Sequence, residues 1–264
     1  MSVNPDNKEI PKPVRNDNRA FAFTLAEVLI TLVIIGVIAA LTIPNLMQNY
    51  KKHQVEVQLK EAYTILSNAL TMARADGAAD SYADMINAAE NASENKYDFF
   101  AEKYLIPYLK VSKTCKVGVS VENCGLFKQN SLLLRNGERK NMQVYNTQEK
   151  SRIGLQNGMF IGVGVSRGGL AAHGITFLVD INGKKGPERM GYDLFLFNID
   201  ASPCTNTNFN NYYCNRPDLI IGGGYGTSLY NYYTPTCNSE GYDCAVVIQR
   251  NSWKIPDNYP VKKF

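Results

Sequence analysis

Residues 23–47 read Phe-Thr-Leu-Ala-Glu-Val-Leu-Ile-Thr-Leu-Val-Ile-Ile-Gly-Val-Ile-Ala-Ala-Leu-Thr-Ile-Pro-Asn-Leu-Met. One carboxylate, that of Glu27, stands near the start of an otherwise apolar run. From Phe23 to Ile43 there are 21 residues, enough to cross the roughly 30 Å hydrocarbon core of a bilayer as a helix. A charge costs about 2.5–3.5 kcal/mol at the centre of a spanning helix and less towards its ends, and it usually has a partner. The stretch predicts a transmembrane helix over residues 23–43 with a special role for Glu27.

The stretch before this helix is polar and carries a basic flank. Its basic residues are Lys8, Lys12, Arg15 and Arg19. Basic residues next to a membrane-spanning helix favour the cytoplasmic side. The flank therefore predicts that everything after the helix lies outside the cytoplasm.

The segment resembles the N-terminus of type IV prepilins and of the pseudopilins of type II secretion systems. In that family a basic leader ends in a small residue, Phe follows, Glu is the fifth mature residue and Pro lies near the 22nd. Counting from Phe23, Glu27 is the fifth residue and Pro44 the 22nd. The resemblance implies cleavage by a prepilin peptidase between Ala22 and Phe23, followed by N-methylation of Phe23. The sequence departs from the family at Ala22, where Gly is usual, and at Ala26, where Ile or Val is common.

Cleavage before Phe23 would create a cationic amine four residues from Glu27. The two groups could pair within one helix, or Glu27 could pair with the amine of a neighbouring subunit and so set the axial register of a filament. The residues alone leave both open, and the resemblance implies the second. A third interpretation is that Glu27 extends to the lipid headgroups without a partner.

Two other interpretations of the N-terminus explain less of the sequence. A secretory signal peptide would be cleaved after small residues such as Ala39 and Ala40, but the apolar run continues to Ile43. An ordinary signal anchor would explain the length of the run but not the spacing of Phe, Glu and Pro.

The helical pattern continues beyond Pro44, with an apolar stripe in steps of three and four residues. The stripe consists of Val55, Leu59, Ala62, Leu66, Ala69 and Ala73. Gly77 provides a stop signal, so we expect one helix over residues 23–76, about 80 Å long. Pro44 removes one of its backbone hydrogen bonds. We expect the stripe to pack on the chain's own globular domain, and the apolar first half to pack on other subunits after it leaves the bilayer.

The sequence divides into a cleaved leader (1–22), the long helix (23–76) and an extracytoplasmic globular domain (77–264). The chain is 45% hydrophobic and 20% charged, and about 190 residues suffice for one hydrophobic core. A short helix is expected over residues 97–105. Strands are expected over residues 159–165, 175–181, 194–199, 219–221 and 245–249. The fold class is α+β, and the resemblance implies a pilin-like arrangement in which the long N-terminal helix packs on a C-terminal antiparallel sheet.

All six cysteines lie in the globular domain, in pairs of sequence neighbours. The pairs are Cys115 with Cys124, Cys204 with Cys214, and Cys237 with Cys244. An even count in an exported chain favours disulfides formed in an oxidising compartment. Six cysteines allow 15 connectivities, of which we favour the three local pairs. No pair has the CxxC spacing, and only His53 and His173 could assist, which argues against a cysteine metal site.

The stretch 180–193 has two interpretations. Asn182-Gly183 after a strand is a strong hairpin-turn signal. The resemblance adds that some pseudopilins bind calcium through a loop with clustered oxygen ligands, and Asp180, Asn182 and Asp193 could supply such oxygen atoms. No other cofactor is expected.

Several other functions lack support in the sequence. The glycines at 222–226 are not followed by the Lys-Ser/Thr of a phosphate-binding loop. Ser166, Ser202 and His173 form no recognisable catalytic triad, so an enzyme is not expected. The net charge of +4 provides no argument for binding nucleic acid.

The resemblance implies a pilin-like subunit, either a pseudopilin or a minor pilin, of a type II secretion pseudopilus or a type IV pilus-like filament. Its implied partners are other pilins, the prepilin peptidase, membrane lipid, and an inner-membrane assembly platform with its ATPase. The chain would first be a single-pass inner-membrane protein whose globular domain lies in the periplasm or outside the cell. The alternative is a membrane-anchored binding or adhesion protein that uses the Asn- and Tyr-rich stretch 206–233 for recognition.

Overall fold

The computed structural model describes residues 24–126, 133–138, 151–165, 175–199, 220–222, 237, 239–261 and 264. The chain forms two compact units, Met1–Leu46 and Met47–Phe264. The leader, the predicted cleavage site at Ala22 and Phe23, the pair Cys204 and Cys214, and the stretch 206–233 apart from 220–222 lie outside the described residues.

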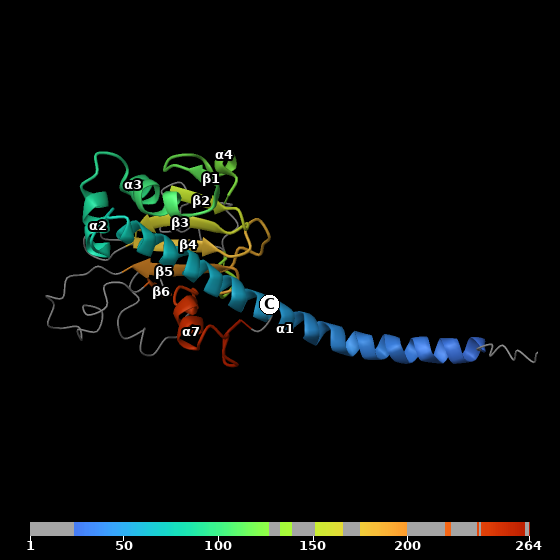
Figure 1. The fold of residues 1–264 in the computed structure, drawn as a ribbon. Coiled ribbons are helices and arrows are strands. Elements are labelled where there is room, and N and C mark those ends of the chain that lie inside the picture. Colours follow the sequence, from blue (N-terminus) through green and yellow to red (C-terminus); the bar gives the residue numbers. More distant parts are fainter. Residues whose placement is uncertain are drawn as a thin grey trace, which may run out of the picture. The chain divides into compact units, whose positions relative to one another are not determined.

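The predicted long helix is present as α1 (Leu25–Ala75), 51 residues in length (Figure 1). It ends as the sequence predicts, at Gly77, whose φ of 75° lies in the left-handed region that glycine tolerates. The Gly77 N–H donates to the Arg74 carbonyl oxygen at 2.9 Å, and the Ala78 N–H donates to the Ala73 carbonyl oxygen at 3.0 Å. This pair of bonds is the Schellman motif, which satisfies the last carbonyl groups of the helix.

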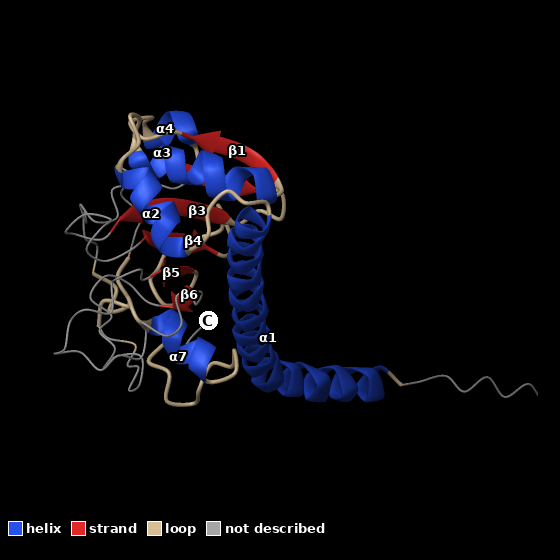
Figure 2. Ribbon diagram, turned by 60° about the vertical axis from the view of Figure 1, so that its left-hand side comes forward, coloured by secondary structure: helices blue, strands red, loops and turns tan. Residues whose placement is uncertain are grey.

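The second unit contains one antiparallel sheet of six strands in sequence order, each paired with the next (Figures 1 and 2). The strands are β1 (Val111–Cys115), β2 (Ser151–Leu155), β3 (Phe160–Val165), β4 (Ile175–Asp180), β5 (Leu194–Ile199) and β6 (Ile220–Gly222). Four of them match strands expected from the sequence to within one residue at each end. The α+β class with a long helix and an antiparallel sheet is confirmed.

The second half of α1 packs against the sheet with the predicted stripe. All six stripe residues are buried, and Leu66 has no exposed surface. On the sheet, the cross-strand pair Phe177 and Phe197 belongs to the same hydrophobic core. Figure 1 shows this half of α1 crossing the strands. The stripe therefore packs on the chain's own domain, as predicted.

Short helices cover the end of the sheet where α1 finishes. They are α2 (Tyr82–Glu90) and α3 (Lys96–Phe100), which continues through one π-helical stretch, Ala101–Leu105, into a 3-10 turn, Ile106–Tyr108. The expected helix over 97–105 is therefore present, with a wider turn in its second half. Ser81 caps α2, because its hydroxyl accepts the Asp84 N–H at 3.2 Å.

The strand expected over residues 245–249 is wrong, because this segment is the helix α7 (Cys244–Arg250). Its run of Ala, Val, Val and Ile is rich in residues that favour strands. Such a local preference is weak, and the packing of the side chains in the folded protein can override it. Cys244, Ala245 and Ile248 are fully buried in the main core. Residues at positions i, i+1 and i+4 lie on the same face of a helix, whereas in a strand they would point to both faces of the sheet.

Two disulfides link cysteines that are close in sequence. One joins Cys115 at the end of β1 to Cys124 in the short helix α4 (Val121–Cys124). The other joins Cys237 to Cys244 at the start of α7. Both are among the three local pairs expected from the sequence. The first belongs to a second hydrophobic cluster with Leu178 and Leu196.

Candidate functional site

The start of α1 is held by a reciprocal capping arrangement between Thr24 and Glu27. The Thr24 backbone N–H and hydroxyl donate to Glu27 Oε2 at 2.9 and 3.0 Å. In return the Glu27 backbone N–H donates to Thr24 Oγ1 at 3.2 Å. This is a capping box, which satisfies N–H groups that have no partner within the helix. The Glu27 carboxylate also lies at the positive end of the helix dipole, which favours its charge.

The first half of α1 exposes its apolar side chains. The exposed fractions of its large hydrophobic side chains range from 46% at Val28 to 81% at Leu25. No part of this apolar stretch is buried, and by length and composition the helix could cross a membrane. Because soluble surfaces rarely carry contiguous apolar patches of this extent, the segment requires a lipid environment or other apolar helices around it.

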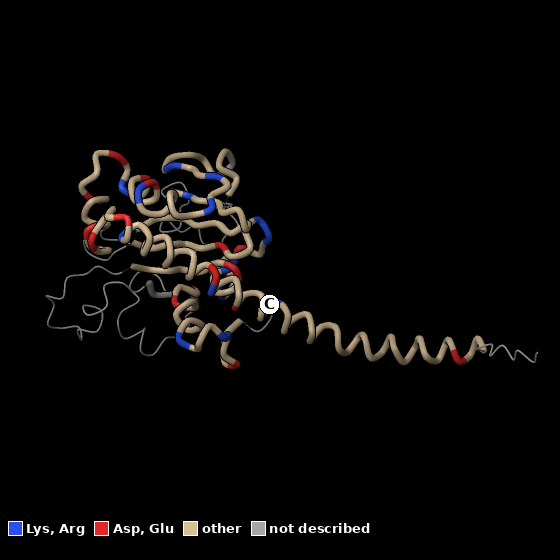
Figure 3. The backbone as a smooth tube through the Cα atoms, viewed as in Figure 1, with Lys and Arg blue, Asp and Glu red and all other residues tan. Residues whose placement is uncertain are grey.

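Glu27 is the one charged residue between Thr24 and Tyr50, and Figure 3 shows the rest of this stretch without acidic or basic positions. Two hydroxyl groups nearby are satisfied within the helix: Thr31 Oγ1 donates to the Val28 carbonyl oxygen and Thr42 Oγ1 to that of Ile38, each at 2.9 Å. These threonines therefore add little polarity to the apolar surface. The carboxylate of Glu27 is the dominant polar feature of the segment.

Pro44 lies inside α1 near the end of the apolar run. Proline has no backbone N–H and its ring crowds the preceding turn, so it removes one hydrogen bond from the helix. It is 17 residues from Glu27. The two predicted assembly residues therefore bracket the apolar segment and do not form a common pocket.

Comparison with known families agrees with this description of the N-terminus. Residues 17–43 match the prokaryotic N-terminal methylation motif. Residues 45–263, most of the chain, match the model of a family of unknown function, DUF6613. The chain belongs to this family. No curated protein and no solved structure matches it. The methylation motif confirms a prepilin- or pseudopilin-type N-terminus on this DUF6613 member.

The stretch with the calcium candidates is a loop of 13 residues, 181–193, between β4 and β5, so Asn182-Gly183 is not the two-residue hairpin turn that the sequence suggested. Asp180 Oδ1 accepts the backbone N–H groups of Asn182 and Gly183 at 3.1 and 2.9 Å. Asp193 Oδ2 accepts the Glu188 N–H at 2.9 Å, and the Asn182 amide lies 3.4 Å from the same oxygen. Both aspartates thus hold the backbone of the loop in place.

The loop leaves few oxygen atoms of these three residues free for a calcium ion. Within the loop, Asp180 Oδ2 and Asn182 Oδ1 are the buried side-chain oxygens without a hydrogen-bond partner, whereas calcium takes about six to eight oxygen ligands. Burial raises the pKa of Asp180 to about 9, and the nearby Glu188 carboxylate adds to the shift. Burial also raises the pKa of Asp193. Among the described residues, no group of three His, Cys, Asp or Glu is arranged to hold a metal.

A buried carboxylate on α1 fixes the C-terminal segment, and sequence reasoning missed it. Glu56 is 7% exposed. Its Oε1 accepts the Ile255 N–H, and its Oε2 accepts from Lys254 Nζ, both at 2.9 Å. Burial opposes ionisation of Glu56, but the bonds from Lys254 and Ile255 outweigh it, and the pKa of Glu56 is lowered. The available signal was an acidic residue directly beside Val55 of the apolar stripe.

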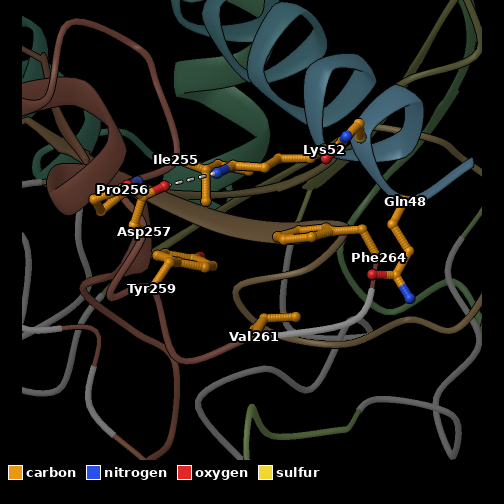
Figure 4. A pocket seen from close by; sticks show the side chains of 9 residues that line it. Gln48, Lys52, Ile255, Pro256, Asp257, Tyr259, Val261 and Phe264 are labelled. Atoms are coloured by element: carbon orange, nitrogen blue, oxygen red, sulfur yellow. Dashed lines mark ion pairs between the residues drawn. The ribbon is translucent and has the colours of Figure 1, made fainter. Parts of the chain in front are cut away.

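The C-terminal segment and α1 line an open pocket of about 180 Å³. Gln48 and Lys52 line it from α1, while Tyr259, Val261 and Phe264 line it from the segment (Figure 4). The Glu56 bonds hold this segment against the helix. The pocket lies entirely within the second unit.

Proposed function

We propose that the mature chain is a pilin-like subunit, a pseudopilin or minor pilin, that assembles into a type II secretion pseudopilus or a type IV pilus-like filament. One observation carries the proposal. An uncovered apolar helix bears a single carboxylate at the fifth position from Phe23, inside a matched methylation motif. The motif and the fold favour a structural subunit over an enzyme, and the motif implies a prepilin peptidase and other pilins as partners.

Two features of the helix support assembly through it. Its apolar side chains leave lipid at little cost only if they become buried against equally apolar surfaces, such as the same helix of other subunits. Glu27 would then be surrounded by hydrocarbon, where an uncompensated charge is strongly unfavourable. The N-terminal amine of a neighbouring Phe23 would compensate it, and that requirement would fix the axial register.

Leaving the membrane requires a source of energy. By family analogy, an inner-membrane platform and its ATPase would supply that energy. The globular unit would remain outside the membrane throughout, where its disulfides suit an oxidising compartment.

The test is the variant Glu27→Gln, made in a cell that contains the assembly machinery. Gln retains a side-chain oxygen that can accept from Thr24, so the cap survives while the charge is lost. We expect normal cleavage, and a decrease of roughly tenfold or more in the chain recovered in sheared filaments, because the partner amine would be left buried and unpaired. The measurement is quantitative immunoblotting of sheared and cell-bound fractions.

Thr24→Ala is the matched control, because it removes the hydroxyl of the cap but keeps the Glu27 charge. It should still enter filaments. Normal incorporation of Glu27→Gln would contradict the intersubunit role. Absence of the unmodified chain from the sheared filaments would favour the alternative, a binding or adhesion protein that uses the helix only as an anchor.

A further inference from the structure

The second half of α1 exposes large hydrophobic side chains on the side away from the sheet. Among the described residues of the second unit, those that are exposed all lie on α1: Met47, Tyr50, Val57 and Met72, each 49–59% exposed. Figure 2 shows the sheet on one side of this half of α1 and no described element on the other side. A gathering of exposed apolar groups on one element indicates an interaction surface.

Three of these residues belong to a stripe that repeats in alternating steps of three and four. The stripe runs from Met47 to Asn68 through positions 50, 54, 57, 61 and 64. This is the seven-residue repeat with which one helix packs along another. The core stripe begins at Val55, two residues before Val57, which is about 200° around the helix. The two stripes therefore lie on opposite faces of α1, and only the core stripe packs on the sheet.

The outward stripe is weakly polar for a surface that faces water. Six of its seven residues are uncharged, whereas the solvent face of a helix usually carries charges. The Thr64 hydroxyl is satisfied within α1, because it donates to the Lys60 carbonyl oxygen at 2.9 Å. The charged member is Glu61, whose Oε1 accepts from Asn157 Nδ2 at 3.0 Å. A second helix could therefore cover the stripe with one charge to compensate.

Two copies of the chain would present this stripe to each other in parallel. In every copy the apolar segment is the N-terminal part of α1, so copies anchored in one membrane have the same orientation. In an unshifted parallel pair, identical positions of the repeat face each other, and the two copies of Glu61 would repel. A shift of four residues instead places Glu61 of one copy opposite Val57 of the other, and every facing position still belongs to the stripe.

Lys60 of the second copy then lies close to Glu61 of the first. Lys60 is exposed and follows Val57 by three residues, about 4.5 Å of helical rise. Side chains on a helix lean towards its N-terminus, so the Lys60 ammonium group extends towards the level of Val57, where Glu61 of the other copy lies. Within one chain Lys60 and Glu61 do not face each other, because they are adjacent positions of a helix.

We propose that the stripe from Met47 to Asn68 is an interface with a second copy of the chain. In this interface parallel α1 helices are shifted by about four residues, and Glu61 of one copy pairs with Lys60 of the other. The proposal rests on the proposed function, which supplies the second copy. It extends the contact between subunits beyond the apolar segment to the second unit, and it gives that contact a charge-dependent register.

Exchange of the two charges tests the pairing. Lys60→Glu and Glu61→Lys should each decrease the chain recovered in sheared filaments about fivefold or more, because like charges then meet at the interface. The double variant Lys60→Glu/Glu61→Lys restores opposite charges and should regain most of the loss. Asn157→Ala is a control, because it removes the hydrogen bond of Glu61 without changing a charge. Lys113→Glu, at an exposed position of β1, controls for added negative charge. Both controls should assemble normally.

A photoreactive residue identifies what covers the stripe. Benzoylphenylalanine in place of Val57 should crosslink, in membranes and in filaments, to residues 47–68 of a second copy, as mass spectrometry of the linked peptides can show. The same residue in place of Asn87, which is exposed on α2, should not link to that range. Circular dichroism establishes that each variant is folded.

Two results would overturn the interface. One is a double variant that assembles no better than the single variants, and the other is position 57 that links to a different protein or to nothing. These results differ from a failure of the proposed function. Absence of the unmodified chain from sheared filaments would refute that function, whereas normal assembly without a link from position 57 would refute the interface alone.

Discussion

The carboxylate of Glu56 accepts a hydrogen bond from the backbone N–H of Ile255 at 2.9 Å, across 199 residues of sequence. The same carboxylate accepts from Lys254 Nζ, and it is almost completely buried. A buried carboxylate is stable only when hydrogen bonds replace its lost hydration. The C-terminal segment supplies two of these bonds, so α1 and the chain end stabilise one another.

Glu56→Gln should destabilise the globular unit at pH 7. Gln can still accept from Ile255, but it loses the charge that binds Lys254. We expect the free energy of unfolding to decrease by about 1.5–3 kcal/mol, the range for hydrogen bonds to charged groups. The measurement is urea unfolding of the detergent-solubilised chain. It can be followed by the fluorescence of the single tryptophan, Trp253, whose ring lies 4.9 Å from that of Tyr63.

The same variant has a defined pH dependence. Because folding lowers the pKa of Glu56, its contribution to stability is present above the unfolded pKa of about 4.3 and is lost as pH falls through the lower folded value. The difference between wild type and Glu56→Gln should therefore shrink below about pH 4. Glu61→Gln, at an exposed position of the same helix, keeps a side-chain oxygen that can accept from Asn157 and should have little effect at either pH. A difference that is constant from pH 7 to pH 3 would contradict this assignment.

Leu66→Ala tests the packing of α1 on the sheet. Leu66 has no exposed surface, and truncation of a buried leucine typically costs about 3–5 kcal/mol through the cavity that it leaves. We expect a loss of this size in the same urea experiment. Met72→Ala, at a position that is 52% exposed, is the control and should change stability by less than about 1 kcal/mol. Similar losses for both variants would show that the stripe does not form the core contact.

Peptide mapping without reduction tests the disulfides. We expect Cys115 to be linked to Cys124 and Cys237 to Cys244, as in the structure, which leaves Cys204 and Cys214 for each other. Replacement of either structural pair by serine should cost about 2–3 kcal/mol, the entropic estimate for loops of about ten residues. A link between cysteines of different pairs would refute the local connectivity.

Chelation tests the loop between β4 and β5. The backbone N–H groups of the loop already occupy most oxygen atoms of Asp180 and Asp193. We therefore expect the midpoint of thermal unfolding to be the same in EDTA and in millimolar calcium. A rise of several degrees with calcium would show that the loop rearranges to bind the ion, as the second interpretation of the sequence holds.

The sequence predicts the long helix well because several local signals agree. The stripe from Val55 to Ala73 has helical spacing, and Gly77 provides the left-handed stop. Strands such as β4 and β5 are also recognisable, because each is a short apolar run between turn residues.

Other strands carry weaker signals. The edge strand β1 is mostly polar and exposed. The strand β2 contains Arg152, which is fully buried and donates to the Val119 carbonyl oxygen. Neither strand shows the alternation or the apolar run that identifies strands in a sequence. In α7 the local residue types favour a strand, whereas packing in the core favours a helix, and the segment is a helix.

The residues of the candidate site also differ in whether the sequence reveals them. Glu27 and Pro44 are identified by their spacing from Phe23, which is a local pattern. The bonds of Glu56 with Lys254 and Ile255, and the pocket beside them, join segments about 200 residues apart. No local sequence pattern predicts such a pairing, because the two segments meet only when the chain end folds back on α1.

The most direct test of the central claim is the intact mass and N-terminal sequence of the chain isolated from native membranes. The prepilin assignment predicts a mature protein that begins at Phe23 and is heavier by one methyl group on its amine. A chain that retains Met1, or one that begins beyond Ala40, would contradict it. The first would indicate a signal-anchored domain, and the second an ordinary secreted protein.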